Sequence, residues 1–281
     1  MKHILYISQW FPTDSQPDLG TFVYKHAQAA ALKHKVTVIY VYPHTKALRQ
    51  VTNEGNLNII RIGIKGSGWK LSWNKRNRYQ HEIAKLQSQC PIDIIHAHVL
   101  LAPAILAQRW AKKINIPYFI TEHWTGYCNG LYQQKPWYYK SLSQKVCKSA
   151  KAIFPVSPFL AKNMQACGLE GNYHIIPNVL GAHCAEPKSL KEGPHITVVA
   201  DLVDAKKNVS GTIRAFAQLH KERPELNLVI VGDGPDRIGL MECCKALSID
   251  EQVHFLGKKD HNSTLQWIAG GQLTVVNSNI E

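Results

Sequence analysis

Apolar and polar positions alternate along the chain in short blocks whose period changes repeatedly between that of a strand and that of a helix. Six short apolar runs in the first 180 residues are typical of buried strands. They are Ile4–Ser8, Val36–Tyr42, Asn58–Ile64, Ile92–Ala97, Tyr118–Thr121 and Ala152–Val156. Segments with helical spacing, such as Thr21–Leu32 and Leu100–Lys112, separate most of them. The alternation predicts right-handed βαβ units that build a parallel sheet.

A second alternation of the same kind begins at His195. It predicts strands at Ile196–Ala200, Leu226–Val231, Val253–Leu256 and Leu273–Asn277, and helices at Val209–Lys221, Asp236–Leu247 and Asn262–Ala269. In doubly wound sheets, ligands bind beyond the carboxyl ends of the strands. We therefore expect the loops that follow Ala200, Val231 and Asn277 to meet in one crevice.

A change of composition and charge separates the two alternations. The segment LGAHCAEPKSLKEGP, which follows Val179, is polar and rich in turn-forming residues. Residues 1–180 carry 22 Lys and Arg against 7 Asp and Glu, whereas residues 181–281 carry 11 against 13. We place a domain boundary here, which gives an N-terminal domain of residues 1–180 and a C-terminal domain of residues 181–281.

Composition excludes several classes of protein. No apolar run approaches the roughly 18 residues of a membrane span, and Ile4–Ile7 is too short for the core of a signal peptide. We expect a cytoplasmic protein. The seven cysteines include no CxxC pair, which favours reduced thiols over disulfides or a zinc site. His96 and His98 share one face of a predicted strand, but without a third ligand nearby we expect no metal there.

The loop DLVDAKKN carries candidate phosphate-binding groups. It leads into a helix that we expect to start near Asn208, and a helix N-terminus presents free N–H groups and a partial positive charge. Lys206 and Lys207 add full charges, and Asn208 is a good N-cap residue. Gly232 would let the backbone approach a ligand closely after the next strand. The alternative for the lysine loop is a capped helix with two solvated lysines, and the alternative for Gly232 is an ordinary tight turn.

Two features of the first half could reach the same ligand. Gly20 opens a helix after the long loop that follows the first strand, and His123 follows the strand in IPYFITEHW. The alternative for the Gly20 segment is a surface loop, and the alternative for His123 is a histidine with a structural role.

Taken together, these segments resemble glycosyltransferase family 4, whose members are retaining enzymes of GT-B fold. The resemblance covers the whole chain and rests on nine strings in the right order. They are DLGTFVYKHAQAAAL, DIIHAHVLLAPAILA, IPYFITEHW, SAKAIFPVSPFLAKNM, IIPNVL, LVDAKKNVSGTIRAFAQL, LVIVGDGPDR, VHFLGK and NSNIE. The resemblance implies an α/β protein with two Rossmann-like, doubly wound domains that face each other across a cleft. The first would be the acceptor-side domain, and the second, incomplete here, would bind the nucleotide-sugar.

The resemblance also implies roles for individual residues. Gly20 becomes a backbone contact to the donor phosphates, and His123 an active-centre contact to the donor sugar. Lys207, or its neighbour Lys206, becomes the cation that binds the diphosphate, with Asn208 at the start of the following helix. Glu281 matches the first carboxylate of the family's Glu, seven residues, Glu motif, and faces the transferred sugar. Asn178 and Gly232 match positions that shape the cleft, with turn geometry as the alternative.

The chain departs from the family pattern in two respects. Family members usually carry Arg where this chain has Asp201, whose carboxylate would repel a diphosphate unless it points away. The motif's second glutamate would fall eight positions beyond Glu281, and the elements that close the second sheet would follow it. We therefore expect the sequence to be a C-terminally truncated piece of a longer enzyme, inactive alone.

The expected activity is transfer of a sugar, with retention of configuration, from a nucleotide-diphosphate sugar to a glycan or lipid-linked acceptor in cell-surface polysaccharide synthesis. The resemblance implies that no metal or other cofactor takes part, and the chain has no Asp-x-Asp motif. An inactive GT-B relative that acts as a scaffold and a nucleotide-sugar epimerase are the alternatives, and no module for nucleic-acid recognition is present.

Basic and aromatic residues alternate in two segments of the first half, KGSGWKLSWNKRNRYQ and LYQQKPWYYKSLSQKVCKSAK. Their aromatic residues are Trp69, Trp73, Trp137, Tyr138 and Tyr139. Cations beside indole rings suit an anionic bilayer, so we expect peripheral attachment to the inner face of the membrane. The alternative is a solvated basic face with its aromatic residues in the core.

Overall fold

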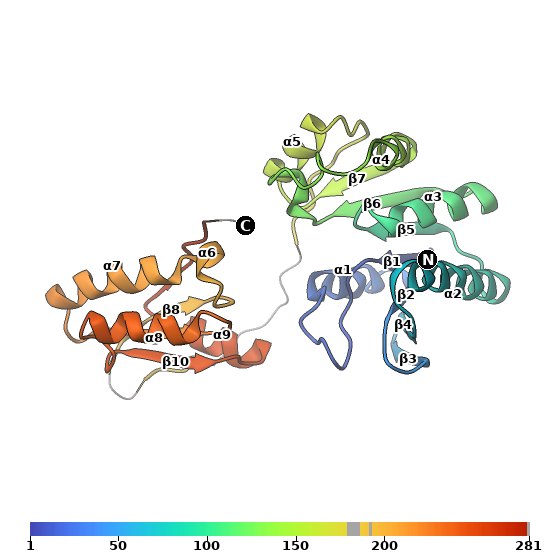
Figure 1. Cartoon of the computed structure of the whole chain (residues 1–281). Coiled ribbons are helices and arrows are strands. Elements are labelled where there is room, and N and C mark those ends of the chain that lie inside the picture. The colour runs from blue at the N-terminus through green and yellow to red at the C-terminus, as the bar shows by residue number, and fades with distance from the viewer. Residues whose placement is uncertain (179–185, 191–192, 280–281) are drawn as a thin grey trace. The chain divides into compact units, whose positions relative to one another are not determined.

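The computed structural model describes residues 1–178, 186–190 and 193–279 of the chain. The chain divides into two compact units, Met1–Gly181 and Ala182–Glu281, each with its own sheet (Figure 1). Each unit is described by itself.

The first unit is built on a seven-stranded sheet with the strand order β3-β4-β2-β1-β5-β6-β7. The strands are β1 (His3–Ser8), β2 (Lys35–Pro43), β3 (Leu48–Glu54), β4 (Leu57–Ile64), β5 (Ile94–His98), β6 (Tyr118–Glu122) and β7 (Ala152–Pro155). The helices are α1 (Thr21–Ala31), α2 (Gly68–Gln89), α3 (Ala102–Ile114), the 3-10 turn η1 (Thr125–Tyr127), α4 (Trp137–Ser149) and α5 (Pro158–Ala166).

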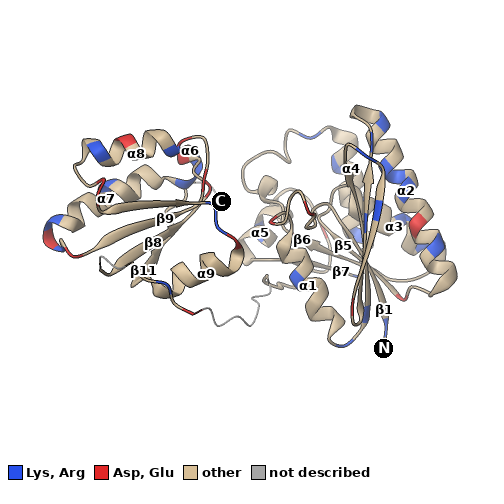
Figure 2. Ribbon diagram, turned by 90° about the horizontal axis from the view of Figure 1, so that it is seen from below, with Lys and Arg blue, Asp and Glu red and all other residues tan. Residues whose placement is uncertain are grey.

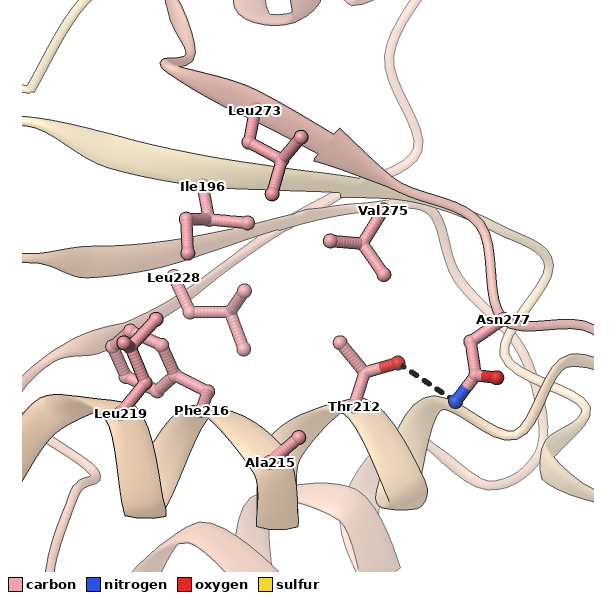
Figure 3. Close-up of a pocket in the computed structure, with 9 residues that line it drawn as sticks. All are labelled: Ile196, Thr212, Ala215, Phe216, Leu219, Leu228, Leu273, Val275 and Asn277. Carbon is pink, nitrogen blue, oxygen red and sulfur yellow. Dashed lines mark hydrogen bonds between the residues drawn. The ribbon is translucent and has the colours of Figure 1, made fainter.

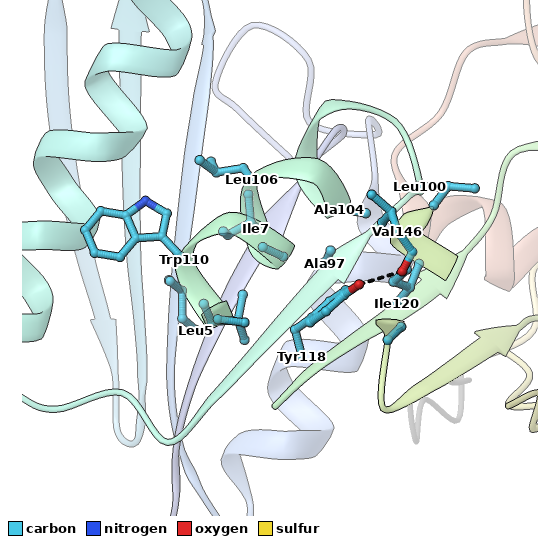
Figure 4. Packing of buried hydrophobic residues seen from close by; sticks show 14 of the residues in the cluster. Leu5, Ile7, Ala97, Leu100, Ala104, Leu106, Trp110, Tyr118, Ile120 and Val146 are labelled. Carbon is cyan, nitrogen blue, oxygen red and sulfur yellow. Dashed lines mark hydrogen bonds between the residues drawn. The ribbon is translucent and has the colours of Figure 1, made fainter. Parts of the chain in front are cut away.

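Both faces of this sheet are buried, which explains why its strands are apolar runs. On β1, Ile4 and Tyr6 belong to the core beneath α1, whereas Leu5 and Ile7 belong to the core beneath α2, α3 and α4. Alternate side chains of a strand point to opposite faces, so β1, β2 and β4 each contribute to both cores. Figure 4 shows the core beneath α2, α3 and α4, in which Leu5 and Ile7 lie close to Leu106 and Trp110 of α3.

The alternation predicted a parallel sheet, but one strand pair of the observed sheet is antiparallel. β3 pairs antiparallel with β4 through a tight turn at Gly55, and it forms the edge of the sheet. All six described residues after Leu48 in this strand are exposed, so β3 carries no apolar run that a pattern could detect. Its Arg49 binds the buried carboxylate of Glu82 on α2, with Nη2 and Oε2 3.2 Å apart.

Two contacts fix the loop that follows β1. The Arg61 guanidinium donates to the carbonyl of Pro12 at 2.8 Å and lies 5.5 Å from the centre of the Phe11 ring. Gly20 ends the loop with φ +69°, and a Cβ on it would lie 2.6 Å from the carbonyl of Trp10. Only glycine combines this left-handed conformation with so close an approach. The start of α1 therefore lies directly against the beginning of the loop.

The second unit is built on a four-stranded parallel sheet with the order β10-β9-β8-β11. The strands are β8 (His195–Val199), β9 (Asn227–Val231), β10 (Val253–Gly257) and β11 (Leu273–Val275). The helices are α6 (Asp204–Lys207), α7 (Val209–Glu222), α8 (Arg237–Ala246) and α9 (His261–Gly270). Ile196 and Val198 of β8 join the core beneath α7 and α8, whereas Thr197 donates to the carbonyl of Trp267 on α9 at 3.0 Å. Helices therefore cover both faces.

Asn208 stands at the N-cap position of α7, where we expected this helix to begin. Asn208 adopts φ +46° and makes no capping hydrogen bond, and Lys206 and Lys207 belong to a separate short helix, α6. The carboxylate of Asp204 instead accepts the Ser210 N–H of α7 at 2.8 Å. Left-handed backbone is tolerated by Asn, and here it turns the chain from α6 into α7.

We predict that Gly20→Ala lowers the free energy of unfolding by about 2–5 kcal/mol, because alanine meets both a left-handed backbone and the carbonyl of Trp10. Gly55→Ala is the matched control, since Gly55 has φ +62° and, apart from its chain neighbours, no described residue lies within 4 Å of the position that its Cβ would take. It should cost only about 1–2 kcal/mol. Urea denaturation of both variants measures the difference. Equal losses would show that the contact with Trp10 contributes nothing.

Candidate functional site

The candidate site of the first unit lies where the strand order reverses. β1 has β2 on one side and β5 on the other, and Ser8 pairs with His98 at their carboxyl ends. The Gln9 N–H donates to the carbonyl of His98 at 3.3 Å, so the two loops diverge from this point. In open α/β sheets such a switch point is where ligands bind.

The buried carboxylate of Glu122, at the end of β6, organises the adjacent loops. Its Oε1 accepts the backbone N–H groups of His123 and Trp124, each at 2.8 Å. Its Oε2 accepts the Leu100 N–H at 2.8 Å and the Tyr127 hydroxyl at 3.0 Å. Burial raises the pKa of Glu122, and these hydrogen bonds oppose the rise. Because backbone N–H groups can only donate, the arrangement favours the ionised carboxylate.

The loop after β5 reaches Glu122 through a strained residue. Val99 adopts φ +78°, a conformation that a β-branched residue rarely takes. Its N–H donates to the carbonyl of Thr121 at 2.8 Å, and the next N–H, that of Leu100, donates to Glu122. Strain of this kind persists only where surrounding contacts hold it, and it is common at functional sites.

His123, which we predicted as a site residue, lies at this switch point. Its Nε2 is 3.2 Å from Nδ1 of His98, and its ring centre is 4.3 Å from that of Phe22 in the first turn of α1. Burial lowers the pKa of His123 to about 3, and the neighbouring His26 contributes to the lowering. The imidazole is therefore neutral at physiological pH.

Two more histidines complete a cluster of imidazoles, which we call the histidine cluster: His26, His96, His98 and His123. The His26 ring centre, on α1, is 5.9 Å from those of both His98 and His123, and the His96 and His98 rings stack at 4.7 Å. Burial lowers the pKa of His96 to about 3 and that of His98 well below its usual value. Sequence reasoning missed His26, because only the fold brings α1 against β5.

The fold therefore places His26 and His123 near His96 and His98. Even so, among the residues that the structure describes, no three His, Cys, Asp or Glu side chains are arranged to hold a metal ion. The six described cysteines are all free thiols.

His26 also connects two other predicted residues. It lies on the helix that Gly20 opens, and burial lowers the pKa of its imidazole while the nearby side chain of Asn178 opposes the lowering. Among the described residues no side chain caps the N-terminus of α1, so its first turn keeps N–H groups for a ligand. Gly20, His123 and Asn178 are thus brought together around His26.

The second unit has its own switch point, between β8 and β11. The loop after β8 contains α6, and the residues after β11 run against it: the Asn279 N–H donates to the carbonyl of Lys206 at 2.8 Å. The Lys207 ammonium donates to the Ser278 hydroxyl at 3.4 Å. Lys207 is half-buried whereas Lys206 is exposed, so Lys207 is the better-placed cation. Glu281 lies outside the described residues.

Gly232 and Gly234 hold the loop after β9 against the loop after β8. A Cβ on Gly232, which has φ +142°, would lie 1.9 Å from the carbonyl oxygen of Ala200, and one on Gly234 would lie 2.5 Å from that of Leu202. The Leu202 N–H donates to the carbonyl of Asp233 at 3.0 Å. The loops after β8, β9 and β11 therefore meet, as predicted, and Gly232 serves this packing. Asp201 is exposed beside them.

A cavity of about 200 Å³ in the second unit lies elsewhere (Figure 3). Apolar side chains of α7, β8, β9 and β11 line most of it. Its two polar lining residues are Thr212 and Asn277, and the Asn277 amide donates to the Thr212 hydroxyl at 3.5 Å. It contains none of the predicted site residues. Its lining is too apolar to bind a diphosphate.

Large aromatic side chains are exposed on α2 and α4. Trp69 is 75% exposed and Trp73 60% on α2, and Trp137 is 80% exposed and Tyr138 63% on α4. Tyr139 instead packs against the core. Figure 2 shows Lys and Arg distributed along α2, whose one acidic residue, Glu82, is buried against Arg49. The alternative in which these aromatic residues lie in the core therefore holds only for Tyr139.

Comparisons with known proteins identify related sequences for both units. The family model described as Glycosyltransferase Family 4 matches residues 19–180, and the model described as Glycosyl transferases group 1 matches residues 185–281. The alpha-monoglucosyldiacylglycerol synthase of Acholeplasma laidlawii is 21% identical over 260 residues, which are 81% of this chain and 62% of that protein. The chain therefore spans less than two thirds of the length of this curated relative.

Several solved structures share the fold. The sucrose-phosphate synthase of Thermosynechococcus elongatus has a TM-score of 0.72 at 15% identity, covering 99% of this chain and 76% of its own. A lipopolysaccharide outer core galactosyltransferase has a TM-score of 0.64 at 14% identity, covering 99% and 75%. A trehalose-6-phosphate structure from E. coli, bound with UDP-2-fluoro glucose, has a TM-score of 0.64 at 12% identity, covering 97% and 78%. The fold is GT-B, with two Rossmann-like units of which the second is smaller.

Within the described part of the chain, no helix has both the length and the apolar character needed to cross a membrane.

We predict that Glu122→Gln lowers the free energy of unfolding by about 3 kcal/mol, because an amide NH₂ would face N–H donors that now bind a carboxylate. Urea denaturation measures the loss. Glu170→Gln is the control: its side chain is 78% exposed in a surface pair with Lys148, so stability should hardly change. Wild-type stability of the Glu122→Gln variant would contradict the organising role of this carboxylate.

Proposed function

The chain belongs to glycosyltransferase family 4, and on that premise we propose that it carries a sugar-transfer activity. The donor would be a nucleotide-diphosphate sugar and the acceptor a hydroxyl of a glycan or lipid-linked molecule. The observation that carries the proposal is the position of Lys207, which is held at the switch point of the second unit by Ser278. A bound UDP-sugar analogue in a structure of similar fold is consistent with this class of donor.

Lys207 is suited to bind the donor diphosphate. Lys207 is half-buried and its ammonium already donates to Ser278, so less side-chain freedom is lost when an anion binds than at an exposed lysine. Negative charge develops on the departing phosphate oxygen in the transition state, and a preorganised cation stabilises it. The Asp204 carboxylate already accepts the Ser210 N–H at the start of α7. The lysine therefore supplies the main attraction in this proposal, without a metal ion or cofactor.

We propose that His123 contacts the donor sugar and that the start of α1 at Gly20 offers backbone N–H groups to phosphate. The neutral imidazole of His123 suits an uncharged hydroxyl partner, because it offers one donor and one acceptor. The uncapped first turn of α1 suits an anion. Glu281 keeps its proposed place beside the transferred sugar.

The reaction that we propose retains the anomeric configuration. The acceptor oxygen forms a bond to the anomeric carbon on the face from which the phosphate leaves, and the bond between that carbon and the phosphate oxygen breaks. The departing phosphate takes the acceptor's proton, so no protein nucleophile is required. An NMR assignment of the product anomer tests this, and an inverted product would overturn it.

We predict that Lys207→Ala weakens binding of the donor by about 10- to 100-fold, because a charge-assisted contact to phosphate is lost. Isothermal titration with a panel of nucleotide-sugars measures the change. Lys206→Ala should weaken binding less, since Lys206 is exposed. Lys221→Ala, at the far end of α7, is the charge-matched control. Unchanged affinity in the Lys207 variant would remove this residue from the site.

We further propose that the first unit attaches peripherally to an anionic membrane surface on the cytoplasmic side and draws a lipid-linked acceptor from it. In βαβ units the crossover helix starts at the carboxyl edge of the sheet. The first turns of α2 and α4, which carry Trp69 and Trp137, therefore lie at the same edge as His123. The name of the Acholeplasma laidlawii relative, alpha-monoglucosyldiacylglycerol synthase, supports an acceptor of lipid class.

We predict that replacing both Trp69 and Trp73 by alanine lowers binding to anionic vesicles by at least about 10-fold, because two indole rings no longer enter the interface. Co-sedimentation with vesicles of phosphatidylglycerol and phosphatidylcholine measures binding. Ile238→Ala is the control, since Ile238 is a 72% exposed apolar side chain of the second unit. Wild-type binding that does not depend on the anionic lipid would contradict membrane attachment.

A further inference from the structure

His98 is a fully buried imidazole with one specific partner. It ends β5, and its ring packs against those of Tyr6, 4.8 Å away, and His96, 4.7 Å away. Its Nδ1 is 3.2 Å from Nε2 of His123, and their rings are nearly parallel, at 15°. Within the described residues, its other nitrogen, Nε2, has no hydrogen-bond partner.

A hydrogen bond between two neutral imidazoles contains one proton, so the protonation of one ring determines that of the other. If Nδ1 of His98 holds the proton, Nδ1 of His123 must be the protonated nitrogen of its own ring. If Nε2 of His123 holds it, Nδ1 of His123 is an acceptor. In either case His98 is hydrogen-bonded to Nε2 of His123, and Nδ1 of His123 remains available for another partner.

The nitrogen that remains is buried and unpartnered. Nδ1 of His123 has no hydrogen-bond partner among the described residues, although almost none of its surface is exposed. Buried polar atoms without partners are uncommon, and each one needs an explanation. A sugar hydroxyl can both donate and accept, so it would satisfy this nitrogen in either tautomer.

We propose that His98 is a positioning residue for His123, which it holds through Nε2 so that Nδ1 is the nitrogen presented to a hydroxyl of the donor sugar. The proposal rests on the proposed function and extends it from His123 to the residue behind it. His98 itself touches no ligand. Phe22 and His26 pack around the His123 ring and limit its rotation.

His96 provides a matched control within the same cluster. It lies on the same strand two residues away, is also buried, and stacks on His98. Its Nε2 is 2.7 Å from the Thr121 hydroxyl and it makes no hydrogen bond to His123. His96→Phe and His98→Phe therefore each remove one buried imidazole hydrogen bond, and only the second removes the bond to His123.

The first experiment needs neither donor nor activity. In ¹⁵N-labelled wild-type protein, a scalar coupling across the hydrogen bond should connect Nδ1 of His98 with Nε2 of His123. The Nε2 signal of His123 should shift in His98→Phe and remain in place in His96→Phe. Absence of the coupling together with an unmoved signal in His98→Phe would overturn the proposal. If His98→Phe does not fold, the coupling in the wild-type protein decides alone.

The second experiment separates this proposal from the proposed function. His98→Phe should weaken binding of a nucleotide-diphosphate sugar by about 3- to 10-fold and leave binding of the nucleoside diphosphate alone unchanged. His96→Phe should leave both unchanged. Equal affinity for the nucleotide-sugar in the wild type and His98→Phe would overturn the sugar contact. If the wild type binds neither ligand, the proposed function fails, while the coupling still reports on the His98–His123 bond.

Discussion

One buried carboxylate holds the loops around which the candidate site of the first unit is built. Glu122 accepts three backbone N–H groups and one hydroxyl, and these come from the loops after β5 and β6 and from η1. A buried charge is tolerable only when such donors replace water. The positive φ of Val99 is one cost of bringing the Leu100 N–H to this carboxylate. The same hydrogen bonds position His123, because its own backbone N–H is one of the four donors.

The sequence pattern predicted most of the architecture because buried parallel strands must be apolar on both faces. It failed at β3, where the strand is an exposed edge and its pairing depends on a turn at Gly55. It located the start of α7 at Asn208 but not the side chain that binds the first turn of this helix. The left-handed backbone that joins α6 to α7 points the Asn208 side chain toward Gly211, and the carboxylate of Asp204 accepts the Ser210 N–H instead.

The site residues divide in a similar way. Residues at strand ends, such as His123, could be found from the sequence, because parallel strands end at the same edge of the sheet. The partners of His123 could not be found, since His26 and His98 are 97 and 25 positions away and only packing brings them near. Gly20 and Gly232 were selected as ligand contacts, yet the structure gives each a packing reason: another backbone segment lies where a side chain would be. That reason and a ligand contact are compatible.

The histidine cluster makes the stability of the first unit depend on pH. Burial lowers the pKa values of His96, His98 and His123, so the folded protein keeps these rings neutral in a range where an unfolded chain would take up protons. Their contribution to stability is fully present above about pH 6.5 and declines as the pH falls toward about 3. Acid should therefore destabilise the first unit at its switch point, where His26 of α1 packs against His98 of β5. The buried imidazoles at the switch point thus make this part of the core sensitive to acid.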